Sequence, residues 1–346
     1  MTDTMRTCKS YWHSGFTLIE LMIGLALGLI ASLAIFSTIS TFEAQRRATG
    51  SGSEMQQNGL LALYSIEQDM RVAGFGLIDA STKPGTMPCT QVDGADTAPV
   101  TITDGGTGSD AITTHSLRSN FGGIVTGAQA ARLTSALGVS PITVDTRKAI
   151  HAGDHLLVPD AAKNCSSSAA TATYPAETAS GVPATTTGTP PMPINIIDLG
   201  SEAPTFTTTQ YRINANNLQQ SVDNGNSWND VASNIVNMQV QYGVAAAGSQ
   251  TVACWTDAVN NSTTCPGTNW STPPAADISR IKSIRIAIVA RSEQRAACTT
   301  TTNANKPVTW TGGPAITLSG NDWGCYRYKV YQTIIPIRTV IWGNLL

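Results

Sequence analysis

The chain has 346 residues and a formal net charge of −2, with 21 Lys and Arg residues against 23 Asp and Glu residues. This balance argues against a nucleic-acid-binding protein, in which positive charge is clustered and in excess. Hydrophobic residues make up 41% of the sequence and charged residues only 13%. The chain can therefore bury a core, as one elaborated domain or as two domains of roughly 150 residues. Its surface must consist mainly of uncharged polar residues, as in many secreted and cell-surface proteins.

The first predicted element is an apolar segment over residues 15–36, GFTLIELMIGLALGLIASLAIF. About 20 apolar residues are enough to cross a bilayer, so this segment is a predicted transmembrane helix. Arg6 and Lys9 precede it, and a basic flank stays on the cytoplasmic side, which predicts export of the rest of the chain. Glu20 is unexpected, because a carboxylate within a membrane helix costs roughly 2.5–3.5 kcal/mol.

The stretch around Glu20, GFTLIELMI, resembles the type III signal of type IV pilins and pseudopilins. The resemblance implies that prepilin peptidase cleaves between Gly15 and Phe16 and methylates the new amino terminus at Phe16. Residues 1–15 would be the leader, which initiation at Met5 would shorten. Glu20 would become the fifth residue of the mature chain, a position that the family keeps acidic. Because a buried carboxylate needs a cation, Glu20 is expected to pair with the amino terminus of a neighbouring subunit on assembly.

A conventional signal peptide is the competing interpretation. Ser32, Leu33 and Ala34 form a small-x-small pattern at which signal peptidase would cleave, and Ile35 would then begin the mature chain. A signal anchor followed by a spacer is a further alternative. Neither of them explains an acidic residue inside the apolar run.

The helix is expected to extend from residue 16 to residue 73, because no proline occurs before Pro84. At 1.5 Å per residue it would be about 87 Å long. Residues 16–36 would lie in the membrane or the filament core, and residues 37–76 would pack on the globular domain. An apolar stripe at helical spacing supports this packing: Leu60, Leu63, Ile66 and Met70.

Residues 77–346 are predicted to form a β-rich globular domain in the periplasm or outside the cell. Short alternating runs lie between Gly, Pro and Asn clusters, and the strongest of them is IKSIRIAIVARS. Pro336 indicates a strand end or a sheet edge. Three polar stretches are interpreted as looped insertions: 160–193, 244–276 and 296–314. The predicted fold class is α+β and, by the resemblance, pilin-like: a long N-terminal helix packed on an antiparallel sheet.

Six of the seven cysteines follow the apolar run: Cys89, Cys165, Cys254, Cys265, Cys298 and Cys325. In an oxidising compartment an even number of cysteines permits three disulfides. We expect Cys254–Cys265, which closes a short loop, then Cys298–Cys325 and Cys89–Cys165. Six cysteines allow 15 pairings, so the sequence leaves other connectivities open.

The sequence contains only weak signals for metal or catalytic sites. His151 and His155 have the spacing of a helical metal site, but Gly153-Asp154 between them favours a turn into a strand. Residues 223–230, DNGNSWND, have calcium-loop-like spacing but lack the glycine and the distal glutamate of that motif, which favours a hairpin turn. No catalytic motif occurs, so neither enzyme activity nor a cofactor or metal is expected.

Five further segments resemble, in sequence order, PilW-like minor pilins: LALYSIEQDMRVAGFG, IHAGDHLLVPD, IVNMQVQYGV, IRIAIVARS and YRYKVYQTIIPIRTVIW. The resemblance implies a minor pilin of a type IV pilus, inserted in the bacterial inner membrane and incorporated at or near the pilus tip. It further implies the major pilin and other minor pilins as partners in initiating assembly, and the presentation of a PilY-type tip adhesin. A minor pseudopilin of type II secretion, or a signal-anchored periplasmic enzyme or carbohydrate-binding module, is the alternative.

Overall fold

The structure is a computed structural model, and the chain divides into two compact units at Gly52 and Ser53. It describes residues 15–75, 91–92, 95–96, 98–118, 131–132, 142–143, 155–159, 164–169, 181–182, 195–198, 205–259, 262–267, 269–303, 306, 310, 312–318 and 320–342.

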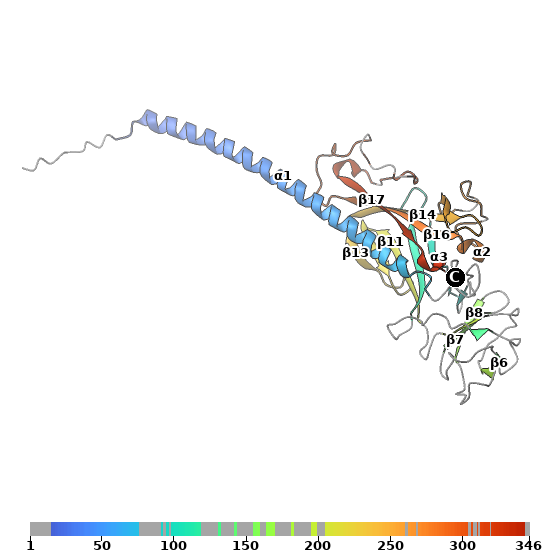
Figure 1. Ribbon diagram of the computed structural model, residues 1–346. Helices are drawn as coiled ribbons and strands as arrows, with labels where there is room; N and C mark the ends of the chain where they lie inside the picture. The colour runs from blue at the N-terminus through green and yellow to red at the C-terminus, as the bar shows by residue number, and fades with distance from the viewer. Residues whose placement is uncertain are drawn as a thin grey trace, which may run out of the picture. The chain divides into compact units, whose positions relative to one another are not determined.

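Helix α1 spans Leu18–Val72 and is drawn in blue in Figure 1. Its bounds agree closely with the helix expected over residues 16–73. In the first unit the side chains from Leu18 to Phe42 are exposed, and the most apolar 18-residue window has a mean hydropathy of 2.4. By length and composition, α1 is therefore a candidate membrane span.

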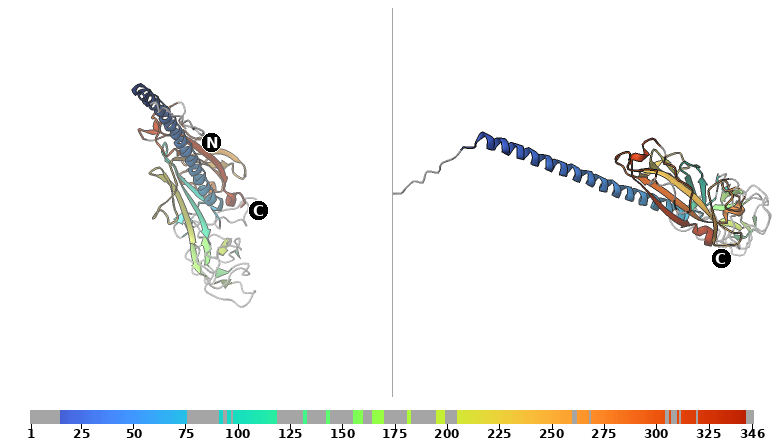
Figure 2. Two further views of the ribbon diagram at one scale, coloured as in Figure 1. Left: turned by 90° about the vertical axis from the view of Figure 1, so that its left-hand side faces the viewer. Right: turned by 90° about the horizontal axis from the view of Figure 1, so that it is seen from above.

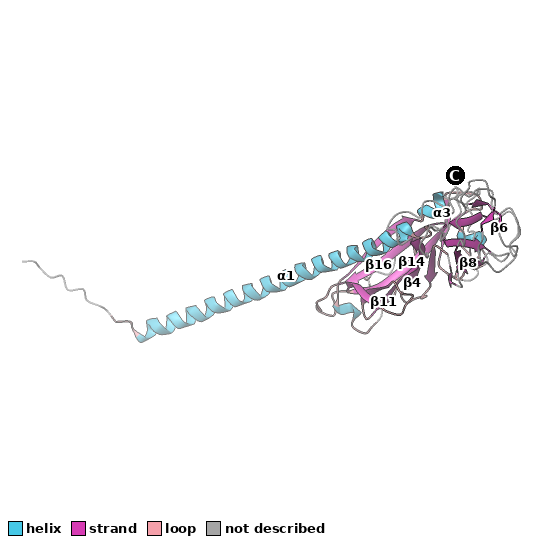
Figure 3. Ribbon diagram, turned by 90° about the horizontal axis from the view of Figure 1, so that it is seen from below, coloured by secondary structure: helices cyan, strands magenta, loops and turns pink. Residues whose placement is uncertain are grey.

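Two antiparallel sheets form the body of the second unit. The β11 sheet has the order β13-β12-β11-β4-β3 and consists of β3 (Val100–Thr103), β4 (Ala111–Arg118), β11 (Thr205–Asn214), β12 (Asn217–Ser221) and β13 (Asn229–Ser233). The β16 sheet has the order β15-β14-β16-β17 and consists of β14 (Ile235–Ala245), β15 (Val252–Thr256), β16 (Ile281–Arg291) and β17 (Tyr328–Pro336). The second half of α1 lies against these two sheets (Figure 3).

Smaller elements complete the described chain. A six-stranded sheet has the order β2-β1-β8-β7-β10-β5, with β1 (Gln91–Val92), β2 (Ala95–Asp96), β5 (Ala131–Arg132), β7 (His155–Pro159), β8 (Asn164–Ala169) and β10 (Asn195–Asp198). A further pair joins β6 (Ile142–Thr143) and β9 (Gly181–Val182). The short helices are α2 (Ala275–Ile278), η1 (Trp323–Cys325) and α3 (Arg338–Trp342). Among the described strand pairs only β1 and β8 run in parallel.

The core lies between the second half of α1 and the two main sheets. The buried positions of this half recur at spacings of three and four: Gly59, Ala62, Ile66, Met70 and Ala73. The expected stripe was therefore wrong at Leu60, which is 52% exposed, and Leu63 is only partly buried. The cause is Gly59, where a Cβ would overlap the ring of Tyr331. The helix can approach β17 only with this glycine inward, and that rotation turns Leu60 to solvent.

Polar contacts fix α1 on the strands. The phenol of Tyr211 donates a hydrogen bond to Asp69 Oδ2 at 2.6 Å, and Gln220 Nε2 donates to the same oxygen at 2.9 Å. Burial and the bond to Asp69 raise the pKa of Tyr211, so the phenol remains a donor. Near the end of the helix, Thr339 Oγ1 donates to the carbonyl oxygen of Ala73 at 2.6 Å. These bonds set the position of α1 along its own axis, which apolar packing alone leaves less defined.

The loop between β3 and β4 joins the two sheets through Asp110. The Asp110 N–H donates to Met238 O at 2.8 Å, and the Val240 N–H donates to Asp110 Oδ2 at 2.7 Å. The Gly105 N–H donates to the other carboxylate oxygen at 2.9 Å. Since β15 pairs with β14 only from Tyr242 onward, Asp110 occupies the part of the β14 edge that β15 leaves open. Burial raises the pKa of Asp110 to about 7.

The three expected insertions differ from one another. Residues 244–276 are partly ordered into β15 and the start of α2. Within residues 296–314, Trp310 is buried and packs with Ile316 on the face of the β16 sheet that α1 does not cover. Of residues 160–193, the described positions are those of β8 and β9, and the others lie outside the described residues. At least two of the insertions thus contribute to the packed structure.

Candidate functional site

The predicted processing site lies at the start of the described chain. Gly15, Phe16 and Thr17 precede the first residue of α1, and the side chain of Phe16 is 87% exposed. Glu20 lies in the first turn of α1 and is exposed. A carboxylate in the first turn also interacts favourably with the positive end of the helix dipole.

Glu20 and Thr17 close a reciprocal hydrogen-bonded cap. The N–H and the hydroxyl of Thr17 each donate to Glu20 Oε2 at 3.0 Å. In return, the Glu20 N–H donates to Thr17 Oγ1 at 3.3 Å. This is a capping box, in which the side chains of the N-cap residue and of the residue three positions later each accept from the other's main-chain N–H, which has no partner within the helix.

The capping box was missed in the sequence, although the spacing Thr-x-x-Glu was its signal. It gives Glu20 a use within its own chain, so the carboxylate does not depend on a neighbour alone. Both donors from Thr17 reach Oε2, and within the described part of the chain no hydrogen bond reaches Oε1. Cleavage before Phe16 would leave every bond of the box intact. The same side chain can therefore cap the helix through Oε2 and accept a cation through Oε1.

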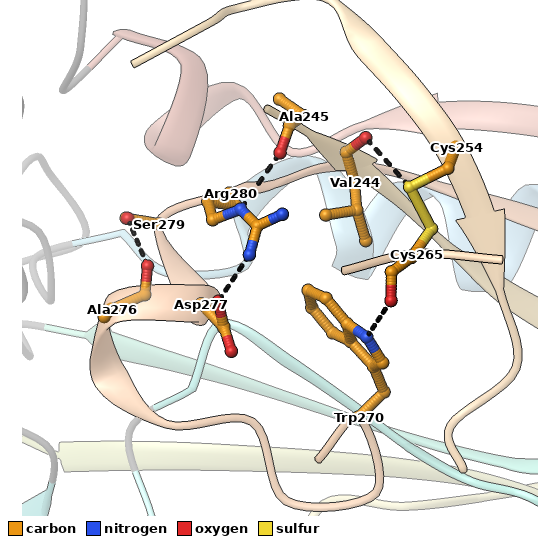
Figure 4. A network of polar contacts seen from close by, with 9 residues as sticks. All are labelled: Val244, Ala245, Cys254, Cys265, Trp270, Ala276, Asp277, Ser279 and Arg280. Carbon is orange, nitrogen blue, oxygen red and sulfur yellow. Dashed lines mark hydrogen bonds and ion pairs between the residues drawn. A yellow bond between two sulfur atoms is a disulfide. The ribbon is translucent and has the colours of Figure 1, made fainter. Parts of the chain in front are cut away.

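The first predicted disulfide, Cys254–Cys265, is present with its Cα atoms 5.6 Å apart. It closes the chain that follows β15, as Figure 4 shows. Trp270 is fully buried beside it and donates from Nε1 to Cys265 O at 3.4 Å. Arg280 bonds Ala245 O through Nε at 3.0 Å and forms an ion pair with Asp277 at 2.6 Å. The segment between β15 and β16 is therefore held near its start by the disulfide and near its end by Arg280.

The second predicted disulfide, Cys298–Cys325, is also present. It joins the chain leaving β16 to the chain entering β17, and Arg295 Nη2 lies 3.5 Å from both sulfur atoms. The third pairing cannot be followed, because Cys89 lies outside the described residues and only the main chain of Cys165, in β8, is described. Cys89–Cys165 stays a prediction.

The two weak candidate metal sites have different outcomes. His155 begins β7, a strand, and His151 lies outside the described residues. The calcium-like segment is a hairpin connection: Asp223 accepts from Ser221 Oγ at 2.7 Å and from the Ser227 N–H at 2.8 Å. Hydrogen bonds from Ser227 lower the pKa of Asp223 to about 2. Its carboxylate is occupied in closing the turn, and no cluster of three metal-ligating side chains occurs among the described residues.

Arg285 in β16 is an enclosed cation that sequence reasoning missed. It lies within the predicted strand IKSIRIAIVARS and is only 9% exposed. Its guanidinium lies 4.7 Å from the ring of Trp255 and 5.0 Å from that of Trp310. It also donates to Gln241 Oε1 and to Gly312 O. The available signal was the presence of tryptophans inside supposed surface insertions, because a tryptophan there needs an apolar or cationic partner.

Comparisons with known proteins give two family matches. The family described as type IV pilus-assembly protein W matches residues 198–339, and the prokaryotic N-terminal methylation motif matches residues 13–36. No curated protein matches the chain. A type IV-like pilin from Thermus thermophilus is a structural neighbour, with a TM-score of 0.36 and 8% identity over 82% of this chain and 97% of that chain. A TM-score this low does not establish a common fold.

Proposed function

Because this chain is a type IV pilin-like protein with a PilW domain and a prepilin methylation motif, we propose that it is a minor pilin. In this proposal the precursor is inserted in the inner membrane through α1, with the β-rich unit in the periplasm. Prepilin peptidase cleaves after Gly15 and methylates Phe16. The mature subunit then enters a type IV pilus at or near its tip and helps other minor pilins to initiate assembly.

The observation that carries the proposal is the start of α1. An exposed apolar helix begins with a carboxylate, Glu20, whose Oε2 is held by Thr17 and whose Oε1 accepts no hydrogen bond among the described residues. A carboxylate placed in hydrocarbon is stabilised when a cation pairs with it. The freed amino terminus of a neighbouring subunit is such a cation, and it becomes available only after processing and assembly.

The bulk of the β-rich region supports a place at the tip. The β-rich region predicted over residues 77–346 has 270 residues, which is large for a subunit repeated along a closely packed shaft. A low copy number and a terminal position avoid this crowding and leave a surface on which a PilY-type adhesin is held. The nearest alternative, a minor pseudopilin of type II secretion, predicts that the protein is absent from sheared pili. Quantitative mass spectrometry of sheared pili separates the two, and parity with the major subunit would identify a shaft component.

The capping box makes a sharp test of Glu20 possible. Glu20→Gln removes the charge but retains a residue that can complete a capping box. Thr17→Ala has the opposite effect, because it weakens the box and keeps the carboxylate. Cells carrying each variant in place of the native protein are compared for precursor cleavage, association with other minor pilins and the number of surface pili.

If Glu20 pairs with a neighbouring amino terminus, Glu20→Gln is cleaved normally but assembles poorly, as does Glu20→Ala. Thr17→Ala then retains most of its assembly, because a lost cap costs about 1 kcal/mol. If instead Glu20→Gln assembles normally and Thr17→Ala assembles poorly, Glu20 acts only as a helix cap. Normal assembly of all three variants would also contradict the proposal.

A further inference from the structure

The two cysteines of the disulfide Cys298–Cys325 differ in their exposure to solvent. Cys298 is exposed, whereas Cys325 is only 1% exposed. Figure 2 shows the segment that this disulfide closes, in orange and red, at one end of the β-rich part. A thiolate in solution can therefore approach Cys298 far more easily than Cys325. An attack from outside is directed to Cys298 Sγ, and Cys325 is the sulfur that would be released.

Arg295 supplies a positive charge to both sulfur atoms. Its Nη2 lies 3.5 Å from Cys298 Sγ and 3.5 Å from Cys325 Sγ, and it forms no ion pair within the described ranges. Burial disfavours a charged thiolate at Cys325, whereas an adjacent guanidinium favours it. In thiol–disulfide exchange a more stable thiolate leaves faster. Arg295 is therefore placed to promote the release of Cys325.

Main-chain hydrogen bonds hold the two joined chains together independently of the disulfide. The Ala296 N–H donates to Cys325 O at 2.7 Å, and the Thr301 N–H donates to Gly324 O at 3.0 Å. The Thr301 hydroxyl also donates to Tyr326 O. Opening the S–S bond leaves these contacts in place. The released thiolate then stays beside its former partner and can close the bond again.

The disulfide Cys254–Cys265 has no such arrangement and serves as an internal control. Cys254 is half-buried and Cys265 is 1% exposed. The sulfur of Cys254 lies 3.8 Å from Val244 O, and among the described residues no basic side chain donates a hydrogen bond to either sulfur atom. Trp270, which is fully buried, lies beside this bond (Figure 4). The two disulfides therefore differ in both access and charge.

We infer that Cys298–Cys325 is a site of thiol–disulfide exchange, at which an external thiolate attacks Cys298 Sγ and Cys325 leaves as a thiolate beside Arg295. The bond between the two cysteines breaks, a new S–S bond joins Cys298 to the external sulfur, and the electron pair of the broken bond passes to Cys325 Sγ. The external thiolate belongs to a small thiol or to the active site of an oxidoreductase, and the chemistry is the same for both.

The exchange gives the surface of the second unit a reversible covalent attachment point. It uses two sulfur atoms and one guanidinium, all distant in sequence from Glu20. The inference therefore stands whether or not the chain is a minor pilin.

The first part of the test compares the two disulfides in the full chain in non-ionic detergent. Reduced glutathione is added, free thiols are alkylated at successive times, and the products are identified by peptide mapping. Cys298–Cys325 should be cleaved at least about tenfold faster than Cys254–Cys265, with the early mixed disulfide on Cys298. Equal rates for the two disulfides, or glutathione found first on Cys325, would overturn the inference.

The second part tests the cation. Arg295→Gln should slow cleavage about threefold to tenfold at low salt, with a smaller effect at high salt, and Arg295→Lys should retain most of the native rate. Arg327→Gln removes another exposed cation from the same end and is the matched control, with an unchanged rate. Unchanged or faster cleavage of Arg295→Gln, or equal slowing in Arg327→Gln, would refute the role of Arg295.

The third part identifies the source of the thiolate and the state of the fold. Reduced thioredoxin replaces glutathione, and the faster reagent per thiol shows whether an oxidoreductase or a small thiol is the better partner. If neither cleaves Cys298–Cys325 faster than the control disulfide, the inference is wrong. The Ala296 and Thr301 amides should stay protected from hydrogen exchange after cleavage. Loss of this protection would show that the bond opens only with local unfolding and would contradict exchange in the folded chain.

Discussion

Asp110 makes the stability of the second unit depend on pH in an unusual direction. The residue is 4% exposed, and burial together with the nearby charges of Asp104 and Asp257 raises its pKa to about 7 from an ordinary value of 3.8. Hydrogen bonds from the Gly105 and Val240 N–H groups act in the other direction, because they favour the ionised form. Desolvation is the larger effect, so the folded state holds a proton that the unfolded state releases.

The pKa shift fixes both the sign and the size of the effect. Because the folded state binds more protons between about pH 4 and pH 7, the free energy of unfolding falls as the pH rises through this window. A shift of about three pKa units corresponds to about 4 kcal/mol over the whole window, at 1.36 kcal/mol per unit. Between pH 5 and pH 8 the expected loss from this one residue is about 2.5 kcal/mol.

The variant Asp110→Asn removes the titration and keeps the shape of the side chain. At pH 5 the folded native carboxyl is itself protonated and keeps one full acceptor, as the Asn amide does, so the variant should lose at most about 1 kcal/mol at this pH. At pH 8 the difference from the native protein should shrink or reverse. The control is Asp104→Asn, a more exposed residue of the same loop, which should retain most of the pH dependence.

Urea unfolding of the full chain in non-ionic detergent, followed by tryptophan fluorescence at pH 5 and pH 8, measures these differences. Comparing each variant with the native protein cancels the contributions of other titrating groups. An identical pH dependence in native protein and Asp110→Asn would refute the reasoning. A native protein that gains stability with pH relative to Asp110→Asn would show that the two N–H donors outweigh burial.

Three further predictions concern processing, packing and oxidation. The mature chain should begin at a singly methylated Phe16 by mass spectrometry, and a terminus at the conventional signal peptidase site would contradict the prepilin assignment. Gly59→Leu should destabilise the second unit by about 1–3 kcal/mol, because the new side chain would overlap the ring of Tyr331. Gly50→Ala, where a Cβ meets no atom within 4 Å, should not destabilise this unit. Thermal unfolding measures both variants. Peptide mapping of the oxidised protein should recover Cys89 linked to Cys165, and thiol labelling of both residues would refute this pair.

The parts of the structure that could be predicted from sequence rest on local patterns. Helix α1 follows from an apolar run and a proline-free stretch, and its observed bounds differ from the expected ones by only one or two residues at each end. Pro336 was expected at a strand end or a sheet edge, and it is the last residue of an edge strand. The pairing of Cys254 with Cys265 was favoured by short separation, and the structure contains it.

The parts that could not be predicted depend on which distant segments meet. The direction of the inward face of α1 is decided by Gly59 against Tyr331, which lies far along the chain. The role of Asp110 could not be predicted, since it depends on where β15 stops pairing with β14. The burial of Arg285 could not be predicted, because nothing local indicates that Trp310 returns over it. The capping box of Glu20 is the exception, because it was local and was overlooked.

The bond between Thr339 and Ala73 joins positions 266 residues apart in the sequence, and Val340 belongs to the same core cluster as Ala73. If the chain is exported as proposed, the core of the second unit therefore cannot close until nearly all of the chain has crossed the membrane. β14 and β16 emerge earlier, and the apolar residues of β16 then lack both α3 and the strand that will flank them, β17. Exposed apolar strands at this stage are prone to misassembly. In the proposed membrane-anchored precursor, α1 would hold one side of the core in place while the other side arrives, so the anchor would also limit how far the folding intermediate can diffuse.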